Sequence, residues 1–223
     1  MKSNKSTRNT ARMVGALFLI AMVSSLTGAF LIEAVIAAPD YLSEISGKSS
    51  QLYAGVYLEI INGLSVVGIA ALMYRIIRQY RESFAAAYLG IRILESMVCI
   101  AAGICPLLLL TLGQEYAGAG GSETAGFQLT GTLIYAARGY LASLLVPVTF
   151  GISALLFYLF LYRTILLPRF ISVWGLIAVG LMLTFNLLRL DQSIGLIFIA
   201  PIILNEVFMG IWLIVKGFNS SEN

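Results

Sequence analysis

The chain has 223 residues, of which 59% are apolar and only 11% are charged. A typical soluble domain contains about 25% charged residues, which supply much of its polar surface. The composition therefore excludes a soluble enzyme, a nucleic-acid-binding protein and a disordered chain, and it favours an all-α integral membrane protein.

Six apolar stretches are long enough to cross the hydrocarbon core of a bilayer, which takes about 20 helical residues. They must be helices, because an open strand would leave backbone groups without partners in lipid. The predicted spans are residues 13–38, 52–74, 85–112, 141–162, 170–188 and 194–215. We therefore predict a basic tail at 1–12, a six-helix membrane domain at 13–216 and a short tail at 217–223.

The distribution of Lys and Arg predicts the orientation, because cytoplasmic segments carry an excess of both. The N-terminal tail contains four, the second-to-third connection three, the fourth-to-fifth connection two and the C-terminal tail one. The opposite side carries only Lys48, Arg138 and Arg189, and Arg92 lies within a span. Both termini are therefore predicted to be cytoplasmic.

The first span also has features of a secretory signal peptide, namely a basic start and Val35-Ile36-Ala37 before Ala38. Its apolar run of about 20 residues is longer than the usual 7–15 residues of a signal peptide, and Glu33 lies close to the cleavage position. We predict that the span is retained. Cleavage would leave the orientation of the other five spans unchanged.

Residues 113–140 form the longest connection on the side opposite the termini and contain seven glycines. The second half, from Phe127 to Tyr140, is apolar enough to contact the bilayer. An interfacial helix, a re-entrant segment and a flexible loop with a frayed helix start all fit this pattern. Among these, we predict the flexible loop.

The residues that are absent exclude several kinds of site. The chain has no histidine, so it lacks a Ser-His or Cys-His nucleophile, a His-ligated zinc and a haem with a proximal His. Asp40 and Asp191 lie outside the spans, which excludes an intramembrane aspartyl pair. Cys99 and Cys105 are about 9 Å apart along one helix, too far for a disulfide. We predict no cofactor, no metal site and no catalytic residue set.

Charged side chains at membrane depth are the most informative, because each costs about 2.5–3.5 kcal/mol when it faces lipid. Such side chains must pair, bind a proton or line a wet cavity. Glu59 and Asn62 are spaced i,i+3, as are Arg92 and Glu95, so each pair shares one helix face. Pro201 lies one turn before Asn205 and Glu206, and a kink there would turn these two side chains inward. The predicted ligand-binding residues are Glu59, Asn62, Arg92, Glu95, Asn205 and Glu206.

A single cluster of these residues contains three carboxylates and one guanidinium. Arg92 stays charged and can pair with one carboxylate. We therefore expect at least one of Glu59, Glu95 and Glu206 to be protonated near neutral pH or to face a bound cation. Two interpretations remain open: a purely structural network, and a site for a proton, a cation or a small ligand.

Three groups of short motifs occur in the same order as in a known protein family. They are Tyr88-Leu89-Gly90-Ile91-Arg92-Ile93-Leu94-Glu95; Leu161-Tyr162-Arg163 with Leu167-Pro168-Arg169 and Trp174-Gly175; and Pro201 and Glu206 with Trp212-Leu213-Ile214-Val215-Lys216-Gly217-Phe218. In these motifs the chain resembles a bacterial family of polytopic membrane proteins, the domain of unknown function 4386. The resemblance implies a location in the bacterial inner membrane and favours Arg92, Glu95 and Glu206 as important positions. It implies no activity.

Three functional classes follow. The excess of acidic residues at depth favours a site for a proton, cation or small molecule that serves transport or sensing. The lack of a catalytic residue set favours a structural or regulatory subunit, with another membrane protein as its partner. An intramembrane enzyme that uses Glu as acid and base on a lipid or quinone is a weaker alternative.

Overall fold

The computed structural model describes residues 2–38, 40–119 and 124–219, and within these ranges it contains helices and no strand. Six helices are long and apolar enough to cross a membrane, which confirms the predicted fold class. They are Ser6–Ile36, Tyr41–Ile77, Glu82–Gly118, Ala125–Thr164, Arg169–Leu187 and Gly195–Val215.

The second and fourth spans are composite helices. The second joins α2 (Tyr41–Glu44), the 3-10 turn η1 (Ile45–Lys48) and α3 (Ser49–Ile77), and the fourth joins α5 (Thr124–Tyr140), the π-helical turn η2 (Leu141–Leu145) and α6 (Val146–Thr164). The remaining elements are α1 (Lys2–Ile36), α4 (Glu82–Gly118), α7 (Arg169–Leu187), the short η3 (Gln192–Ile194) and α8 (Gly195–Val215).

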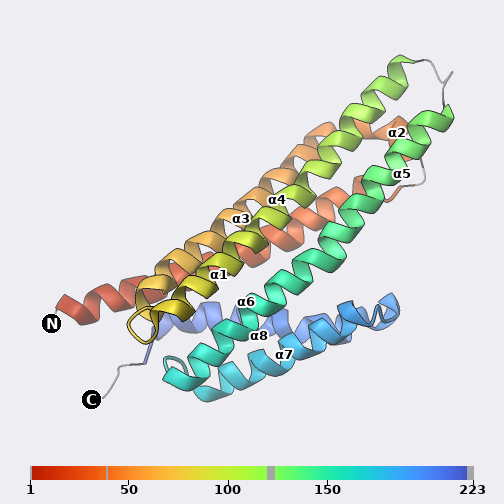
Figure 1. Cartoon of the computed structure of the whole chain (residues 1–223). Helices are drawn as coiled ribbons and strands as arrows, with labels where there is room; N and C mark the ends of the chain where they lie inside the picture. The colour runs from red at the N-terminus through yellow and green to blue at the C-terminus, as the bar shows by residue number, and fades with distance from the viewer. Residues whose placement is uncertain (1, 39, 120–123, 220–223) are drawn as a thin grey trace.

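The spans form a closed ring in which each packs mainly against two neighbours, in the order α1, α3, α4, α6, α7, α8 and back to α1. The start of α1 and the end of α8 lie at one end of the bundle, and the end of α4 and the start of α5 lie at the opposite end, which we call the far end (Figure 1). An even number of spans requires this placement of the termini. Their cytoplasmic location stays a prediction.

Glycine allows the closest helix contacts in the ring. A Cβ atom added to Gly28 of α1 would lie only 2.9 Å from the carbonyl oxygen of Gly55 in α3. A Cβ atom added to Gly15 would approach the carbonyl oxygen of Gly210 in α8 in the same way, at 2.5 Å. Backbones that approach this closely gain packing contacts, which are a main source of helix association in lipid.

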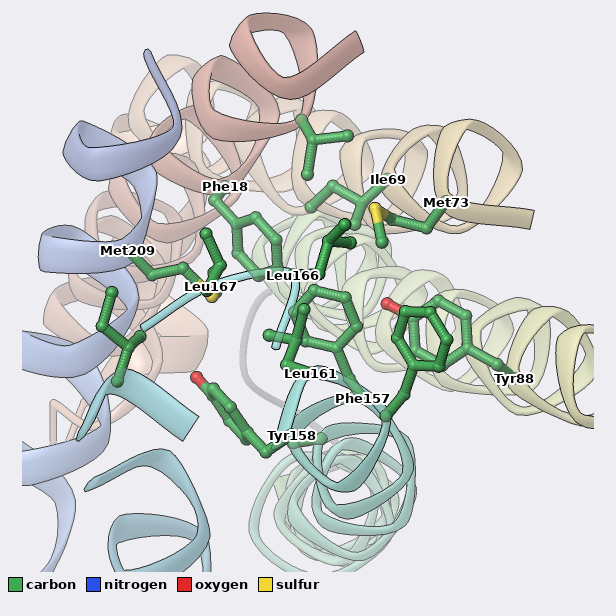
Figure 2. Packing of buried hydrophobic residues seen from close by; sticks show 14 of the residues in the cluster. Phe18, Ile69, Met73, Tyr88, Phe157, Tyr158, Leu161, Leu166, Leu167 and Met209 are labelled. Carbon is green, nitrogen blue, oxygen red and sulfur yellow. The ribbon is translucent and has the colours of Figure 1, made fainter. Parts of the chain in front are cut away.

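Two apolar clusters hold the bundle together. The larger one lies toward the termini and contains residues from all six spans, and its aromatic centre includes Phe18, Tyr88 and Phe157 (Figure 2). The Phe157 ring lies 5.8 Å from that of Phe18 and 5.5 Å from that of Tyr88. The smaller cluster, toward the far end, contains buried residues of α1, η1, α3 and α4 only. Among the described residues, apolar packing therefore closes the ring more completely near the termini.

The structure corrects the prediction for residues 113–140. Helix α4 continues to Gly118, and α5 begins at Thr124 and runs into α6 through η2, so the flexible-loop interpretation is wrong for residues 124–140. Residues 120–123 lie outside the part of the chain that the structure describes. Pro147 is the second residue of α6, two positions after η2 ends at Leu145. Proline lacks an N–H group and its ring crowds the carbonyl four residues earlier, which explains the wider π-helical turn at this point.

Candidate functional site

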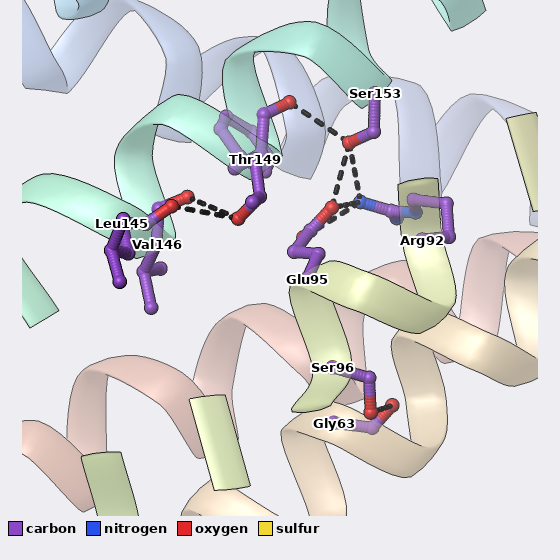
Figure 3. Close-up of polar contacts among 9 residues, drawn as sticks. Gly63, Arg92, Glu95, Ser96, Leu145, Val146, Thr149 and Ser153 are labelled. Atoms are coloured by element: carbon purple, nitrogen blue, oxygen red, sulfur yellow. Dashed lines mark hydrogen bonds and ion pairs between the residues drawn. The ribbon is translucent and has the colours of Figure 1, made fainter. Parts of the chain in front are cut away.

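Arg92 and Glu95 form a buried ion pair on α4, as their i,i+3 spacing predicts. The Nη1 atom of Arg92 donates to both carboxylate oxygens of Glu95, at 2.9 and 3.0 Å. Ser153 of α6 donates its hydroxyl proton to Glu95 at 2.7 Å, and these three side chains point toward one another in Figure 3. Their exposed fractions are 4%, 3% and 0%, so α4 and α6 hold the pair away from lipid.

The face of α4 beside this ion pair is fixed against α3. Ser96 donates a hydrogen bond of 2.9 Å to the carbonyl oxygen of Gly63 (Figure 3). A Cβ atom at Gly63 would lie 2.9 Å from the Ser96 hydroxyl oxygen, so glycine leaves room for this contact. The hydrogen bond fixes the position of α4 and thereby the direction in which Arg92 and Glu95 point.

A cavity of about 410 Å³ lies within the ring and is lined by residues from all six spans. Phe18, Val66, Phe150 and many other apolar side chains form most of its wall. Ligand sites are usually concave and mostly apolar, with few polar groups and volumes of roughly 300–1,000 Å³. Four of the six predicted site residues line this cavity, namely Asn62, Arg92, Glu95 and Glu206.

Glu206 is the carboxylate of this cavity that lacks a direct partner. Arg92 and Glu206 border both the large cavity and an adjoining space of about 10 Å³, yet they form no ion pair. Among the described residues, no side chain or backbone group makes a hydrogen bond to the Glu206 carboxylate. If all three groups are ionised, the cavity carries one guanidinium and two carboxylates, an excess of one negative charge.

Two further polar atoms beside Glu206 are unsatisfied. The Nε atom of Arg92 and the hydroxyl oxygen of Tyr88 are buried and have no hydrogen-bond partner within the described part of the chain. Both residues border the adjoining space of about 10 Å³. A space of this size holds about one water molecule, which gains two to four hydrogen bonds in such places.

Glu59 lies in a different cluster from the one predicted. Its carboxylate accepts a hydrogen bond of 3.0 Å from Nη2 of Arg138, a residue of α5 that is only 3% exposed. Arg138 also donates to Glu33 of α1 at 3.1 Å and to the carbonyl oxygen of Ala102 in α4 at 2.9 Å. Arg138 thus joins α5 to α1, α3 and α4, and Glu59 is removed from the central group.

Asn205 is also separate from the central cavity, although it adjoins Glu206 in the sequence. It is fully buried, and its amide donates to the carbonyl oxygen of Ile171 in α7 at 3.0 Å. Its amide oxygen accepts a hydrogen bond of 2.7 Å from the Tyr158 hydroxyl of α6. Asn205 therefore connects α8 to α6 and α7, while Glu206, on the next position of the helix, faces the cavity.

Sequence reasoning missed Arg138 and Ser153. Arg138 falls in residues 113–140, which are predicted as a loop, although the apolar run from Phe127 onward indicates that the fourth span begins before residue 141. Ser153 gives no comparable signal, because a single serine in an apolar helix more often bonds its own backbone, as Ser65 and Thr149 do here. Cys99 and Cys105 are buried and free, as predicted.

A ring of six apolar helices with charged side chains inside it defines a polytopic integral membrane protein. The family model described as "Domain of unknown function (DUF4386)" matches residues 13–217, and the chain belongs to this family. No curated protein and no solved structure matches the chain. The family resemblance of the motifs is therefore confirmed over nearly the whole chain.

Proposed function

We propose that the central cavity binds a small, mainly apolar molecule that carries one positively charged group, and that this binding serves transport or sensing across the membrane. The unpaired carboxylate of Glu206 in an apolar cavity is the observation that carries the proposal. A protonated amine beside Glu206 would balance the excess negative charge. The apolar walls would hold the rest of the molecule.

The character of the cavity favours an organic cation over a metal ion. Metal sites for hard cations need several oxygen ligands, and the described residues contain no group of three His, Cys, Asp or Glu side chains that could hold a metal. Glu95 is already paired with Arg92. One free carboxylate among apolar side chains suits a single ammonium group on a hydrophobic skeleton.

The test compares two probes with the same skeleton, 2-naphthylethylamine and the corresponding alcohol. We expect the amine to bind the purified protein and to raise its melting temperature, and we expect the alcohol to bind more weakly. Hydrogen bonds to charged groups contribute about 1.5–3 kcal/mol, so Glu206→Gln should weaken amine binding by roughly 10- to 100-fold.

Glu115→Gln is the matched control, because it removes the same charge from an exposed position near the end of α4. This variant should bind the amine as the unchanged protein does. Equal amine binding by Glu206→Gln and the unchanged protein would overturn the proposal. So would equal binding of the amine and the alcohol, and a protein that binds neither would be better described as a structural or regulatory subunit.

The proposal places the protein in the bacterial cytoplasmic membrane with both termini in the cytoplasm. The family resemblance and the excess of Lys and Arg on the side of the termini support this placement. Reporter fusions test it. A fluorescent protein fused to the C-terminus should fluoresce, as expected in the cytoplasm. Alkaline phosphatase, which is active only outside the cytoplasm, should be active when fused after Arg189 and inactive when fused after Arg163.

A further inference from the structure

Three basic side chains lie on the side of the bundle opposite the termini, and two of them are paired. Lys48 forms an exposed ion pair with Glu44, and Arg138 is held by Glu33 and Glu59. The third, Arg189, forms no ion pair and no side-chain hydrogen bond with any described residue. The nearby Asp191 carboxylate instead accepts a hydrogen bond from the backbone N–H of Ser193 at 2.8 Å.

Arg189 borders a groove of about 460 Å³ between the α5–η2 segment and the far end of α7. Helix α7 ends at Leu187, so Arg189 lies just beyond the end of a membrane span. Tyr135 and Tyr140 of α5 form part of the opposite wall. Arginine and tyrosine at the end of a span are typical of the boundary between hydrocarbon and lipid headgroups.

Apolar side chains form part of the groove lining. Leu144 and Phe185 line the groove, and Phe185 also lines the central cavity. Gly139 leaves the groove open, because a Cβ atom added there would meet no atom within 4 Å. The groove thus combines an unpaired guanidinium just beyond the end of a membrane span with the apolar side chains of Leu144 and Phe185.

We propose that this groove binds one anionic phospholipid, with its phosphate on Arg189 and an acyl chain between the α5–η2 segment and α7. Guanidinium groups bind phosphate oxygens through paired N–H donors, which gives both strength and orientation. The acyl chain covers Leu144 and Phe185. This inference is independent of the ligand proposed for the central cavity.

The first experiment follows lipid retention by native mass spectrometry. Protein purified in detergent is mixed with phosphatidylglycerol, and the fraction that keeps one bound lipid is measured during increasing activation in the gas phase. One basic residue near a membrane surface contributes enough attraction for about fivefold tighter binding of an anionic lipid, so Arg189→Gln should lower retention by about that factor. Lys48→Gln removes the same charge on the same side from a paired residue and should keep the lipid.

A second pair of variants tests the acyl-chain position without changing charge. Gly139→Leu places a side chain in the groove, and Gly126→Leu adds the same group elsewhere on α5, where a Cβ atom also meets no atom within 4 Å. We expect Gly139→Leu to lose the lipid and Gly126→Leu to keep it.

Three results would overturn the inference. The first is equal retention by Arg189→Gln and the unchanged protein, and the second is retention by Gly139→Leu. The third is complete displacement of the lipid by inorganic phosphate, because a bound acyl chain prevents that exchange. Loss in both groove variants with retention in both controls supports it.

Discussion

Two arginines are buried in the described part of the chain, and both pair with glutamate, but they differ in how many of their N–H donors have partners. Arg138 uses Nε, Nη1 and Nη2 in hydrogen bonds to Glu33, Glu59 and the carbonyl oxygen of Ala102. Arg92 uses Nη1 for Glu95 and Ser153, and its buried Nε has no partner among the described residues. Glu206 faces the same cavity without an ion pair.

This difference distinguishes a stabilising contact between helices from a candidate binding site. A guanidinium that donates from all three of its nitrogens, and that contacts three other helices, fixes the α5 end of the fourth span. A guanidinium with one carboxylate beside an apolar cavity, and with a second carboxylate close by, leaves unsatisfied groups that a bound molecule can satisfy. The Arg138 cluster therefore accounts for stability, and the Arg92–Glu206 region accounts for the proposed binding.

The largest effect is expected from Arg138→Gln, because removal of one member of a buried ionic group leaves the others uncompensated. The free energy of unfolding in detergent should fall by about 3–5 kcal/mol. Lys48→Gln, which breaks an exposed ion pair, should cost no more than about 1 kcal/mol. Similar losses in the two variants would contradict the role given to Arg138.

A smaller loss is expected from Glu95→Gln, which keeps the shape of the side chain and removes its charge. The hydrogen bonds from Arg92 and Ser153 become weaker, and the free energy of unfolding should fall by about 1.5–3 kcal/mol. A double-mutant cycle with Ser153→Ala measures the coupling between Glu95 and Ser153. Strictly additive losses would show that the hydrogen bond between Glu95 and Ser153 does not stabilise the bundle.

Asn205 adjoins Glu206 in the sequence but makes two hydrogen bonds, and Asn205→Leu removes both. The substitution leaves the Tyr158 hydroxyl without its partner in the core, and the expected loss is about 1–3 kcal/mol in the free energy of unfolding. Tyr158→Phe in the same chain should recover part of this loss, because both polar groups are then gone. No recovery would indicate that Asn205 acts through packing alone.

The sequence predicted the fold well because membrane spans depend on local apolar length. The Arg92–Glu95 pair was also predictable, since both residues lie on one helix at i,i+3. The single six-residue cluster was not found, because Glu59 pairs with Arg138, which is 79 residues away in a segment interpreted as a loop. Which helix faces approach one another depends on helix tilt and on close contacts such as Gly28 with Gly55, and one sequence does not specify these.

Glu206→Gln should change the free energy of unfolding less than the preceding variants, because Glu206 makes no hydrogen bond or ion pair with the described residues. An amide of the same shape removes an unpaired charge from an apolar cavity, so the free energy of unfolding should stay within about 1 kcal/mol of its starting value or rise. Chemical unfolding without added ligand measures this. A loss as large as that of Glu95→Gln would mean that Glu206 belongs to the stabilising network, and the contrast between the two arginine regions would fail.

The smallest effect on stability is expected from Asp191, which lies between α7 and α8. Its contribution is measured by comparing Asp191→Ala with the unchanged protein, because both contain the same buried carboxylates. The backbone N–H of Ser193 stabilises its carboxylate and holds the pKa of Asp191 below the ordinary value of 3.8. A lowered pKa in the folded protein stabilises at neutral pH, and this contribution disappears as the pH falls from about 3.8 through the folded pKa. The melting temperatures of Asp191→Ala and the unchanged protein should therefore differ slightly at neutral pH and converge in acid. A difference that grows on acidification would contradict this sign.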